Sequence, residues 1–215
     1  MADINESWKK ITVKIVYYGP ALSGKTTNLI GLHDLVSGGN CGELMSLETK
    51  GDRTLFFDLL PLAVTTESKF SIVFKLFTVP GQVAHDATRK AVLSRADGVV
   101  FVADSQVSQA LNNAESFENL ENNCRRVGID FDTLPLVVQF NKRDMDHIET
   151  EDKIRELWGP TGIPLVFASA IHGRGVMETF SEIVGRCYRH LDTAHGLEMK
   201  FGIREKDFMR IAGVK

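Results

Sequence analysis

A glycine-rich loop near the start of the chain has the residue types and spacing that bind phosphate groups, in the order Gly19-Pro20-Ala21-Leu22-Ser23-Gly24-Lys25-Thr26-Thr27. Its two glycines let backbone amides curl around a β-phosphate, and the N-terminus of the helix expected next adds partial positive charge. Lys25 can reach the β- and γ-phosphate oxygens, and the Thr26 hydroxyl can bind Mg²⁺. The pattern predicts a nucleotide site in which the phosphates contact Gly19, Ala21, Leu22, Ser23, Gly24, Lys25, Thr26 and Thr27.

A second motif, Asn141-Lys142-Arg143-Asp144, indicates which base is bound. It follows an apolar strand expected over 134–141, and α/β sheets bind ligands at the carboxyl ends of their strands. A carboxylate on Asp144 can accept two N–H bonds from guanine, whereas adenine presents the opposite donor and acceptor pattern. The next expected strand ends at Ala168-Ser169-Ala170, where a backbone N–H can meet guanine O6. The sequence therefore favours GTP and GDP as ligands, with Asn141, Lys142, Asp144, Ser169 and Ala170 at the base.

The hydrophobic pattern supplies the elements that must position these motifs. Short β-branched or aromatic runs alternate with amphipathic helical patterns, which predicts an α/β fold with a mainly parallel sheet. Strands are expected over 11–18, 70–79, 98–104, 134–141 and 165–169, and helices after the phosphate loop, around 111–127 and around 176–191. The strand over 98–104 is almost continuously apolar, as in a sheet covered by helices on both faces. Residues 41–69 fit less cleanly and are expected to combine a possible strand over 55–60 with a mobile loop.

Length and composition narrow the class of protein. A chain of 215 residues and 23.9 kDa suits one domain. Its 25 basic and 28 acidic residues form no block of like charge, which disfavours nucleic acid as a ligand. Cys41, Cys124 and Cys187 contain no CxxC pair, so we expect neither a disulfide framework nor a zinc site, but a reducing, cytoplasmic compartment. No apolar run approaches the ~20 residues that span a bilayer, so direct membrane insertion is not expected.

The C-terminal tail is apolar enough to require an explanation. We divide the chain into a domain over 1–191 and an extension over 192–215, which contains Met199, Phe201, Ile203, Phe208 and Ile211. These side chains either dock on the surface of the domain or bind a partner.

The order of these motifs, together with a Thr-containing loop and a Gly-Gln loop, resembles Ras-like small GTPases across residues 11–191. More specifically, the chain resembles bacterial MglA-type GTPases, which set cell polarity in gliding motility. The segments that carry this resemblance are Val16-Tyr17-Tyr18-Gly19-Pro20, Asp52-Arg53-Thr54-Leu55-Phe56-Phe57-Asp58 and Thr78-Val79-Pro80-Gly81-Gln82.

The resemblance implies a P-loop NTPase with a three-layer Ras-like fold and the activity of a GTPase. It further implies a switch that is monomeric when free, and whose GTP form recruits polarity or motility effectors, with recruitment to a cell pole by partners. The GTPase-activating partner that it implies is a homodimer of the roadblock fold.

The resemblance also implies catalytic roles for particular residues. Thr54 joins Thr26 as a Mg²⁺ ligand, and Gly81 gives its backbone N–H to the γ-phosphate. Gln82 orients the attacking water, Lys25 neutralises the β- and γ-phosphate oxygens, and Arg53 acts as an arginine finger supplied in cis. An alternative reading makes Arg53 a solvated loop arginine.

Two departures from the Ras-like pattern predict slow hydrolysis. Thr78 stands where these proteins usually have an Asp that holds Mg²⁺ through water, and a neutral residue contributes no charge there. Ala21 stands at a loop position where Gly is common, so its methyl group is expected near the catalytic Gln. These departures leave open a catalytically idle GTP-binding scaffold. A nucleotide kinase is disfavoured, because the Asn-Lys-Arg-Asp motif is present and no arginine-rich lid is evident.

Overall fold

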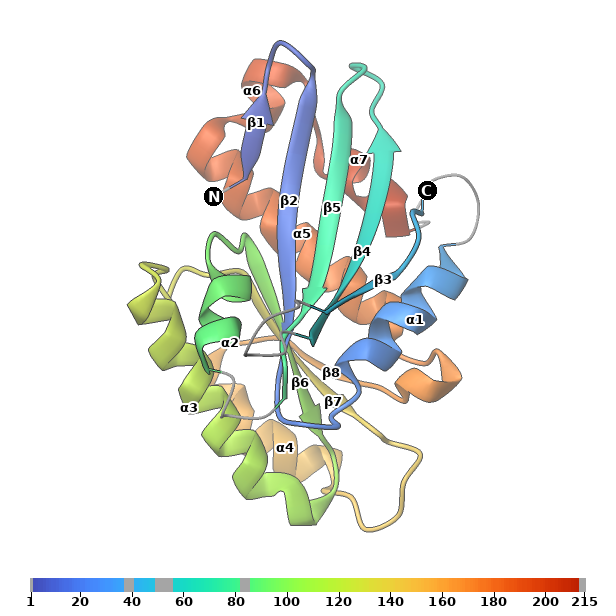
Figure 1. Cartoon of the computed structure of the whole chain (residues 1–215), viewed down its shortest axis with the longest axis vertical. Coiled ribbons are helices and arrows are strands. Elements are labelled where there is room, and N and C mark those ends of the chain that lie inside the picture. The colour runs from blue at the N-terminus through green and yellow to red at the C-terminus, as the bar shows by residue number, and fades with distance from the viewer. Residues whose placement is uncertain (1, 37–40, 49–55, 82–85, 213–215) are drawn as a thin grey trace.

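A twisted sheet with helices on both faces forms the protein, as the computed structural model shows for residues 2–36, 41–48, 56–81 and 86–212 (Figure 1). The strands are β1 (Asp3–Asn5), β2 (Lys10–Tyr18), β3 (Met45–Glu48), β4 (Phe56–Thr65), β5 (Ser71–Thr78), β6 (Gly98–Asp104), β7 (Leu136–Asn141) and β8 (Leu165–Phe167). They lie in the order β3-β4-β5-β2-β6-β7-β8, with β1 paired to β2. The longer helices are α1 (Lys25–Leu35), α2 (Asp86–Leu93), α3 (Ala110–Arg126), α4 (Glu151–Trp158) and α5 (Val176–His195).

The central strands are parallel, as the alternation of strands and helices predicts. β2 pairs in parallel with β5 and β6, and the parallel series continues through β7 to β8. All seven residues of β6 are buried, in agreement with its apolar sequence. The mainly parallel α/β fold expected from the sequence is therefore confirmed.

One edge of the sheet differs from the expected parallel pattern. β4 runs antiparallel to β5 and to β3, and it is longer than the possible strand over 55–60. Its register pairs Leu59 with Phe77, which brings the start of β4 to the carboxyl end of β5. Two neighbouring strands can thus contribute side chains to the same end of the sheet.

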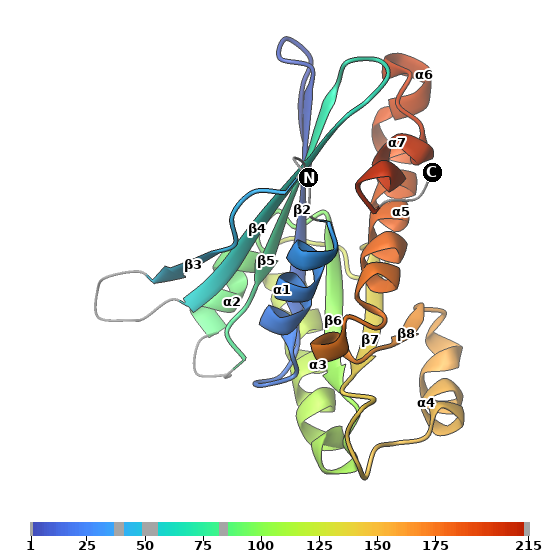
Figure 2. The same ribbon diagram turned by 90° about the vertical axis from the view of Figure 1, so that its right-hand side faces the viewer.

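Two hydrophobic cores lie on opposite faces of the sheet (Figure 2). One core packs α1 and α5 against the sheet through side chains such as Leu29 and Phe180. The other packs α2, α3 and α4 through side chains such as Leu93, Leu120 and Ile154. In the part of the chain that the structure describes, no helix is long and apolar enough to cross a membrane.

The C-terminal tail belongs to the first core. Helix α5 continues to His195, and the short helices α6 (Leu197–Phe201) and α7 (Glu205–Met209) follow. Leu197, Ile203 and Phe208 are fully buried, and the Phe208 ring lies 5.6 Å from that of Phe74 in β5. The structure thus has the docked arrangement of the tail, whereas the division of the chain at residue 191 stays a prediction.

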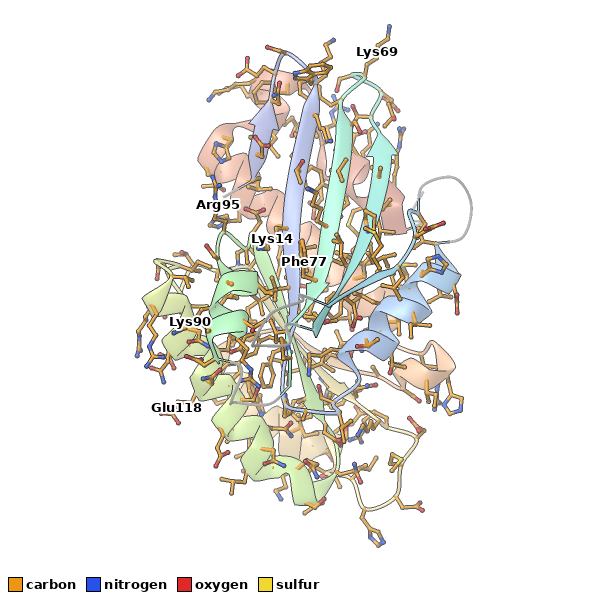
Figure 3. All side chains as sticks on the ribbon, in the orientation of Figure 1. Lys14, Lys69, Phe77, Lys90, Arg95 and Glu118 are labelled. Carbon is orange, nitrogen blue, oxygen red and sulfur yellow. The ribbon has the colours of Figure 1, made fainter. Side chains whose placement is uncertain are left out.

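Lys14 and Phe77 lie close together on β2 and β5, near the middle of the molecule (Figure 3). Lys14 of β2 extends over the ring of Phe77 in β5, with its Nζ 5.0 Å from the ring centroid. The same Nζ donates a hydrogen bond to the Ser94 carbonyl at 2.8 Å, and partial burial lowers the pKa of Lys14. Lys14 therefore covers apolar surface with its stem while its charged end is satisfied.

Candidate nucleotide-binding site

The phosphate loop connects the end of β2 to the start of α1, the context that the sequence predicts. Gly19 and Gly24 have φ angles of 141° and 98°, which side-chain-bearing residues rarely adopt. A Cβ on Gly24 would lie 2.2 Å from the Nδ2 of Asn141, so this glycine also allows contact between the two nucleotide motifs. The neighbouring Leu22 is 88% exposed in the loop.

Lys25 is a buried cation without a carboxylate as its hydrogen-bond partner among the described residues. Its Nζ donates to the carbonyls of Gly19 at 3.1 Å and Pro20 at 2.6 Å. Burial and, to a smaller extent, the charge of Arg89 together lower the pKa of Lys25 to about 7, against an opposing effect of the Asp58 carboxylate. An ammonium group held this way gains much from an anion entering the loop.

Asp58 supplies a carboxylate that the sequence motifs do not reveal. Its Oδ2 accepts hydrogen bonds from the hydroxyl of Thr26 at 2.6 Å and from that of Thr78 at 3.0 Å. The backbone N–H of Asp58 in β4 donates to Thr78 Oγ1 in β5 at 2.9 Å, which adds a side-chain hydrogen bond between these two strands. The neutral Thr78 thus holds a carboxylate from the neighbouring strand β4 instead of providing one.

This donor set fits Mg²⁺. Mg²⁺ in nucleotide sites is bound by one or two protein oxygen ligands together with phosphates and waters. The Asp58 carboxylate and the Thr26 hydroxyl provide such oxygens beside the phosphate loop. Among the described residues, no group of three or more His, Cys, Asp or Glu side chains could hold a metal ion.

These residues surround a cavity of ≈ 390 Å³. Its lining consists of Leu22, Gly24, Lys25, Thr26, Thr27, Asp58, Thr78, Val79, Pro80 and Gly81. Gly81 lies so close to the phosphate loop that a Cβ on it would be 2.2 Å from the Cα of Ala21. The loop after β5 and the phosphate loop therefore meet at Ala21.

The base motif lies at the ends of β7 and β8. The Asn141 side chain donates to the Ser23 carbonyl and accepts from the Ala170 N–H, both at 2.9 Å. Lys142 forms an ion pair with the buried Asp104, at 2.6 Å between Nζ and Oδ2. These contacts join the phosphate loop, β6, β7 and the segment after β8 into one rigid framework.

Asp144 is exposed at the mouth of this framework. Its carboxylate accepts a hydrogen bond from the Ser169 hydroxyl, and this bond holds the pKa of Asp144 below its usual value. The carboxylate is therefore ionised at neutral pH, the state that accepts two N–H bonds from guanine.

The structure thus brings together the phosphate-loop residues, Gly81, and the base-motif residues Asn141, Lys142, Asp144, Ser169 and Ala170. Arg53, Thr54 and Gln82 lie outside the described residues, so their roles stay predictions. Motif reasoning missed Asp58 and Arg89. Asp58 stands inside the strand expected over 55–60, but its place beside Thr26 depends on the pairing of β4 with β5, which no local pattern predicts.

A mainly parallel sheet with a phosphate loop after β2 and an Asn-Lys-x-Asp motif at the carboxyl end of β7 defines a P-loop GTPase fold of the Ras-like class. No protein-family model matches the chain. Over 183 residues the chain is 46% identical to the mutual gliding-motility protein MglA of Myxococcus xanthus (strain DK1622), an alignment covering 85% of this chain and 94% of that protein. The chain belongs to the MglA family.

Proposed function

We propose that the protein is a GTP-binding molecular switch that slowly hydrolyses GTP to GDP and phosphate and is stimulated by a partner. The observation that carries the proposal is the cavity at the phosphate loop, where a buried lysine, a carboxylate with two hydroxyl partners, and Gly81 converge. The base motif is hydrogen-bonded to the same loop through Asn141. Phosphates and a guanine base joined by a ribose account for both halves of the site.

The residues have distinct tasks in this proposal. Lys25 exchanges its two carbonyl partners for β- and γ-phosphate oxygens and neutralises charge there. Thr26, Thr54 and Asp58 hold Mg²⁺, which when bound supplies positive charge to the phosphates. Gly81 donates its N–H to the γ-phosphate, so that the loop after β5 differs between the GTP and GDP states.

Two residues act on the transition state of hydrolysis in this proposal. Gln82 orients the attacking water, and Arg53 stabilises the charge that grows on the γ-phosphate. Ala21 packs against Gly81, the residue before Gln82, so its methyl group lies beside the loop that carries Gln82, which supports a slow intrinsic rate.

For the cellular role, the name of the relative associates that protein with gliding motility. We infer a corresponding role here, in which the GTP form binds effectors that control cell polarity or motility and partners recruit it to a cell pole. The GTPase-activating partner in this proposal is a homodimer of the roadblock fold.

A single-turnover assay of phosphate release tests the proposal against a catalytically idle scaffold. Protein loaded with GTP in the presence of Mg²⁺ is expected to release phosphate slowly alone and faster with a roadblock-type partner. The matched control is GTP-loaded protein in EDTA, which should release less. Stable GTP over many hours with the partner present would favour the idle scaffold and contradict hydrolysis.

A further inference from the structure

Arg89 of α2 is fully buried, yet the described residues offer its guanidinium no carboxylate as a hydrogen-bond partner. Its Nε donates to the Pro80 carbonyl at 2.9 Å, and its Nη2 donates to the Gly81 carbonyl. The guanidinium also lies over the ring of Tyr18, 5.2 Å from the centroid. A buried charge is costly, so its use to hold two consecutive carbonyls of the loop after β5 requires an explanation.

The geometry of the peptide unit provides that explanation. The Pro80 carbonyl and the Gly81 N–H belong to one planar peptide unit, which is trans because the described chain contains no cis peptide bond. In a trans unit these two groups point in opposite directions. By holding the carbonyl, Arg89 directs the Gly81 N–H away from the guanidinium. The second bond, to the Gly81 carbonyl, holds the next peptide unit, so Arg89 restrains the backbone on both sides of the Gly81 Cα.

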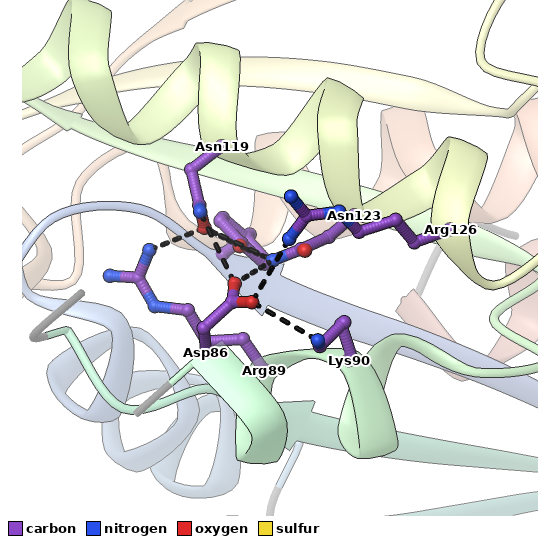
Figure 4. A network of polar contacts seen from close by, with 7 residues as sticks. Asp86, Arg89, Lys90, Asn119, Asn123 and Arg126 are labelled. Carbon is purple, nitrogen blue, oxygen red and sulfur yellow. Dashed lines mark hydrogen bonds and ion pairs between the residues drawn. The ribbon is translucent and has the colours of Figure 1, made fainter. Parts of the chain in front are cut away.

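The other end of the guanidinium is anchored to α3 (Figure 4). Its Nη1 donates to Asn119 Oδ1 at 2.7 Å, and this oxygen also accepts from the Tyr18 hydroxyl at 2.5 Å. Asn119 and Asn123 in turn donate to Asp86, at 3.3 Å and 2.8 Å. Arg89 is therefore held by a network that spans β2, α2 and α3. Through its bonds to Pro80 and Gly81, it fixes these two residues relative to that network.

The position of this loop relative to the phosphate loop determines what the Gly81 N–H can contact. Gly81 packs against Ala21 and lines the same cavity as Lys25. The charge of Arg89 reaches this cavity, since it contributes to the lowered pKa of Lys25.

We propose that Arg89 is the positioning residue that aims the Gly81 N–H at the γ-phosphate, and that it thereby sets the preference of the protein for GTP over GDP. The inference rests on the proposed function, because it assumes that guanine nucleotides occupy the cavity. The planar fork of arginine can hold two adjacent carbonyls, whereas the single ammonium of lysine cannot reproduce this geometry.

The test compares Arg89→Lys and Arg89→Met with the matched control Arg126→Met. Arg126 is an exposed residue that contacts Asp86 in the same network at 3.2 Å but, among the described residues, forms no hydrogen bond to Pro80 or Gly81. Dissociation constants for GDP and for a non-hydrolysable GTP analogue are measured with Mg²⁺ present by displacement of a fluorescent guanine nucleotide.

We expect both Arg89 variants to lose about tenfold or more in the ratio of GTP-analogue affinity to GDP affinity, because the GTP complex alone loses a hydrogen bond to a charged phosphate oxygen. Their affinity for GDP should stay within about threefold of the unmodified protein. Arg126→Met should keep the original ratio. An unchanged ratio in Arg89→Lys, or an equal loss for both nucleotides, would overturn the inference and leave Arg89 a structural residue.

Two further measurements keep the test decisive. If the Arg89 variants fail to fold, as judged by thermal melting, Asn119→Leu removes the anchor of Arg89 on α3 and leaves Arg89, Pro80 and Gly81 in the chain. A fall in the same ratio then supports the inference, and an unchanged ratio overturns it. If the unmodified protein binds no guanine nucleotide, the proposed function itself fails, and this outcome is distinct from one in which only the Arg89 variants depart from expectation.

Discussion

The lowered pKa of Lys25 predicts that nucleotide binding depends on pH between 7 and 9, a range in which an ordinary lysine stays charged. In the nucleotide-free site its pKa is about 7, because burial and the nearby Arg89 disfavour the charged form. Phosphates next to the ammonium favour the charged form and raise this pKa in the complex. Binding above pH 7 therefore takes up a proton, and the affinity must fall as the pH rises.

The magnitude follows from the fraction of protein that carries the proton. For a pKa of about 7 in the free protein and a charged lysine in the complex, the affinity falls about eightfold between pH 7.5 and pH 8.5. A lysine with the ordinary pKa of 10.5 would leave the affinity almost unchanged over this interval. The interval also lies above the second pKa of a phosphate ester, ~6, so titration of the phosphate contributes little.

Calorimetric titration of nucleotide-free protein with GDP, in buffers of different ionisation enthalpy, measures both the affinity and the number of protons taken up. We expect close to one proton per nucleotide at pH 8.5. The control is Lys25→Arg, whose guanidinium stays charged throughout, so its affinity should be weaker or equal but flat with pH. A flat profile for the unmodified protein would refute the role assigned to the buried lysine.

Three other perturbations test separate parts of the account. Asp58→Asn keeps the side-chain shape but removes the charge beside Thr26, so the Mg²⁺ concentration needed for half-maximal GTP retention should rise about tenfold or more; an unchanged requirement would mean that the carboxylate does not serve the metal. Arg53→Ala and Gln82→Leu should reduce partner-stimulated phosphate release, by up to ~10³–10⁵ for a fully engaged arginine finger, while nucleotide affinity stays within about tenfold; equal losses in both would indicate binding residues. Phe208→Ala should lower the free energy of unfolding, measured by urea titration, by ~3–5 kcal/mol, because its ring is fully buried against Phe74. Met199→Ala is the control on the same tail; its side chain is 85% exposed, so the same free energy should change by less than ~0.5 kcal/mol.

Local sequence patterns were sufficient for the motifs that lie within one element and the loop after it. The phosphate loop follows β2, and the base motif follows β7, because each depends on a strand and the residues directly behind it. The apolar run over 98–104 likewise indicated a buried central strand, and β6 occupies that range. These features follow from short-range periodicity and turn chemistry.

Features that depend on tertiary packing were not predictable in this way. Asp58 reaches Thr26 only because β4 pairs antiparallel with β5, and nothing local to the sequence sets that register. Arginine is a residue type usually found at exposed helix positions. Arg89 is buried because α2 packs against α3 and Tyr18. The apolar residues of the tail indicated that another surface covers them. Only the structure shows that this surface is the core formed by α1, α5 and the sheet, against which Phe208 packs.

Competition binding measures directly whether this site selects guanine nucleotides. A fluorescent GDP bound to the protein is titrated with GTP, ATP and xanthosine triphosphate, for the unmodified chain and for Asp144→Asn. The account predicts that GTP displaces the probe from the unmodified protein far better than ATP, and that Asp144→Asn, having lost one acceptor for the guanine N–H groups, binds GTP more weakly and xanthosine triphosphate more tightly. Equal displacement by ATP and GTP from the unmodified protein would contradict the account.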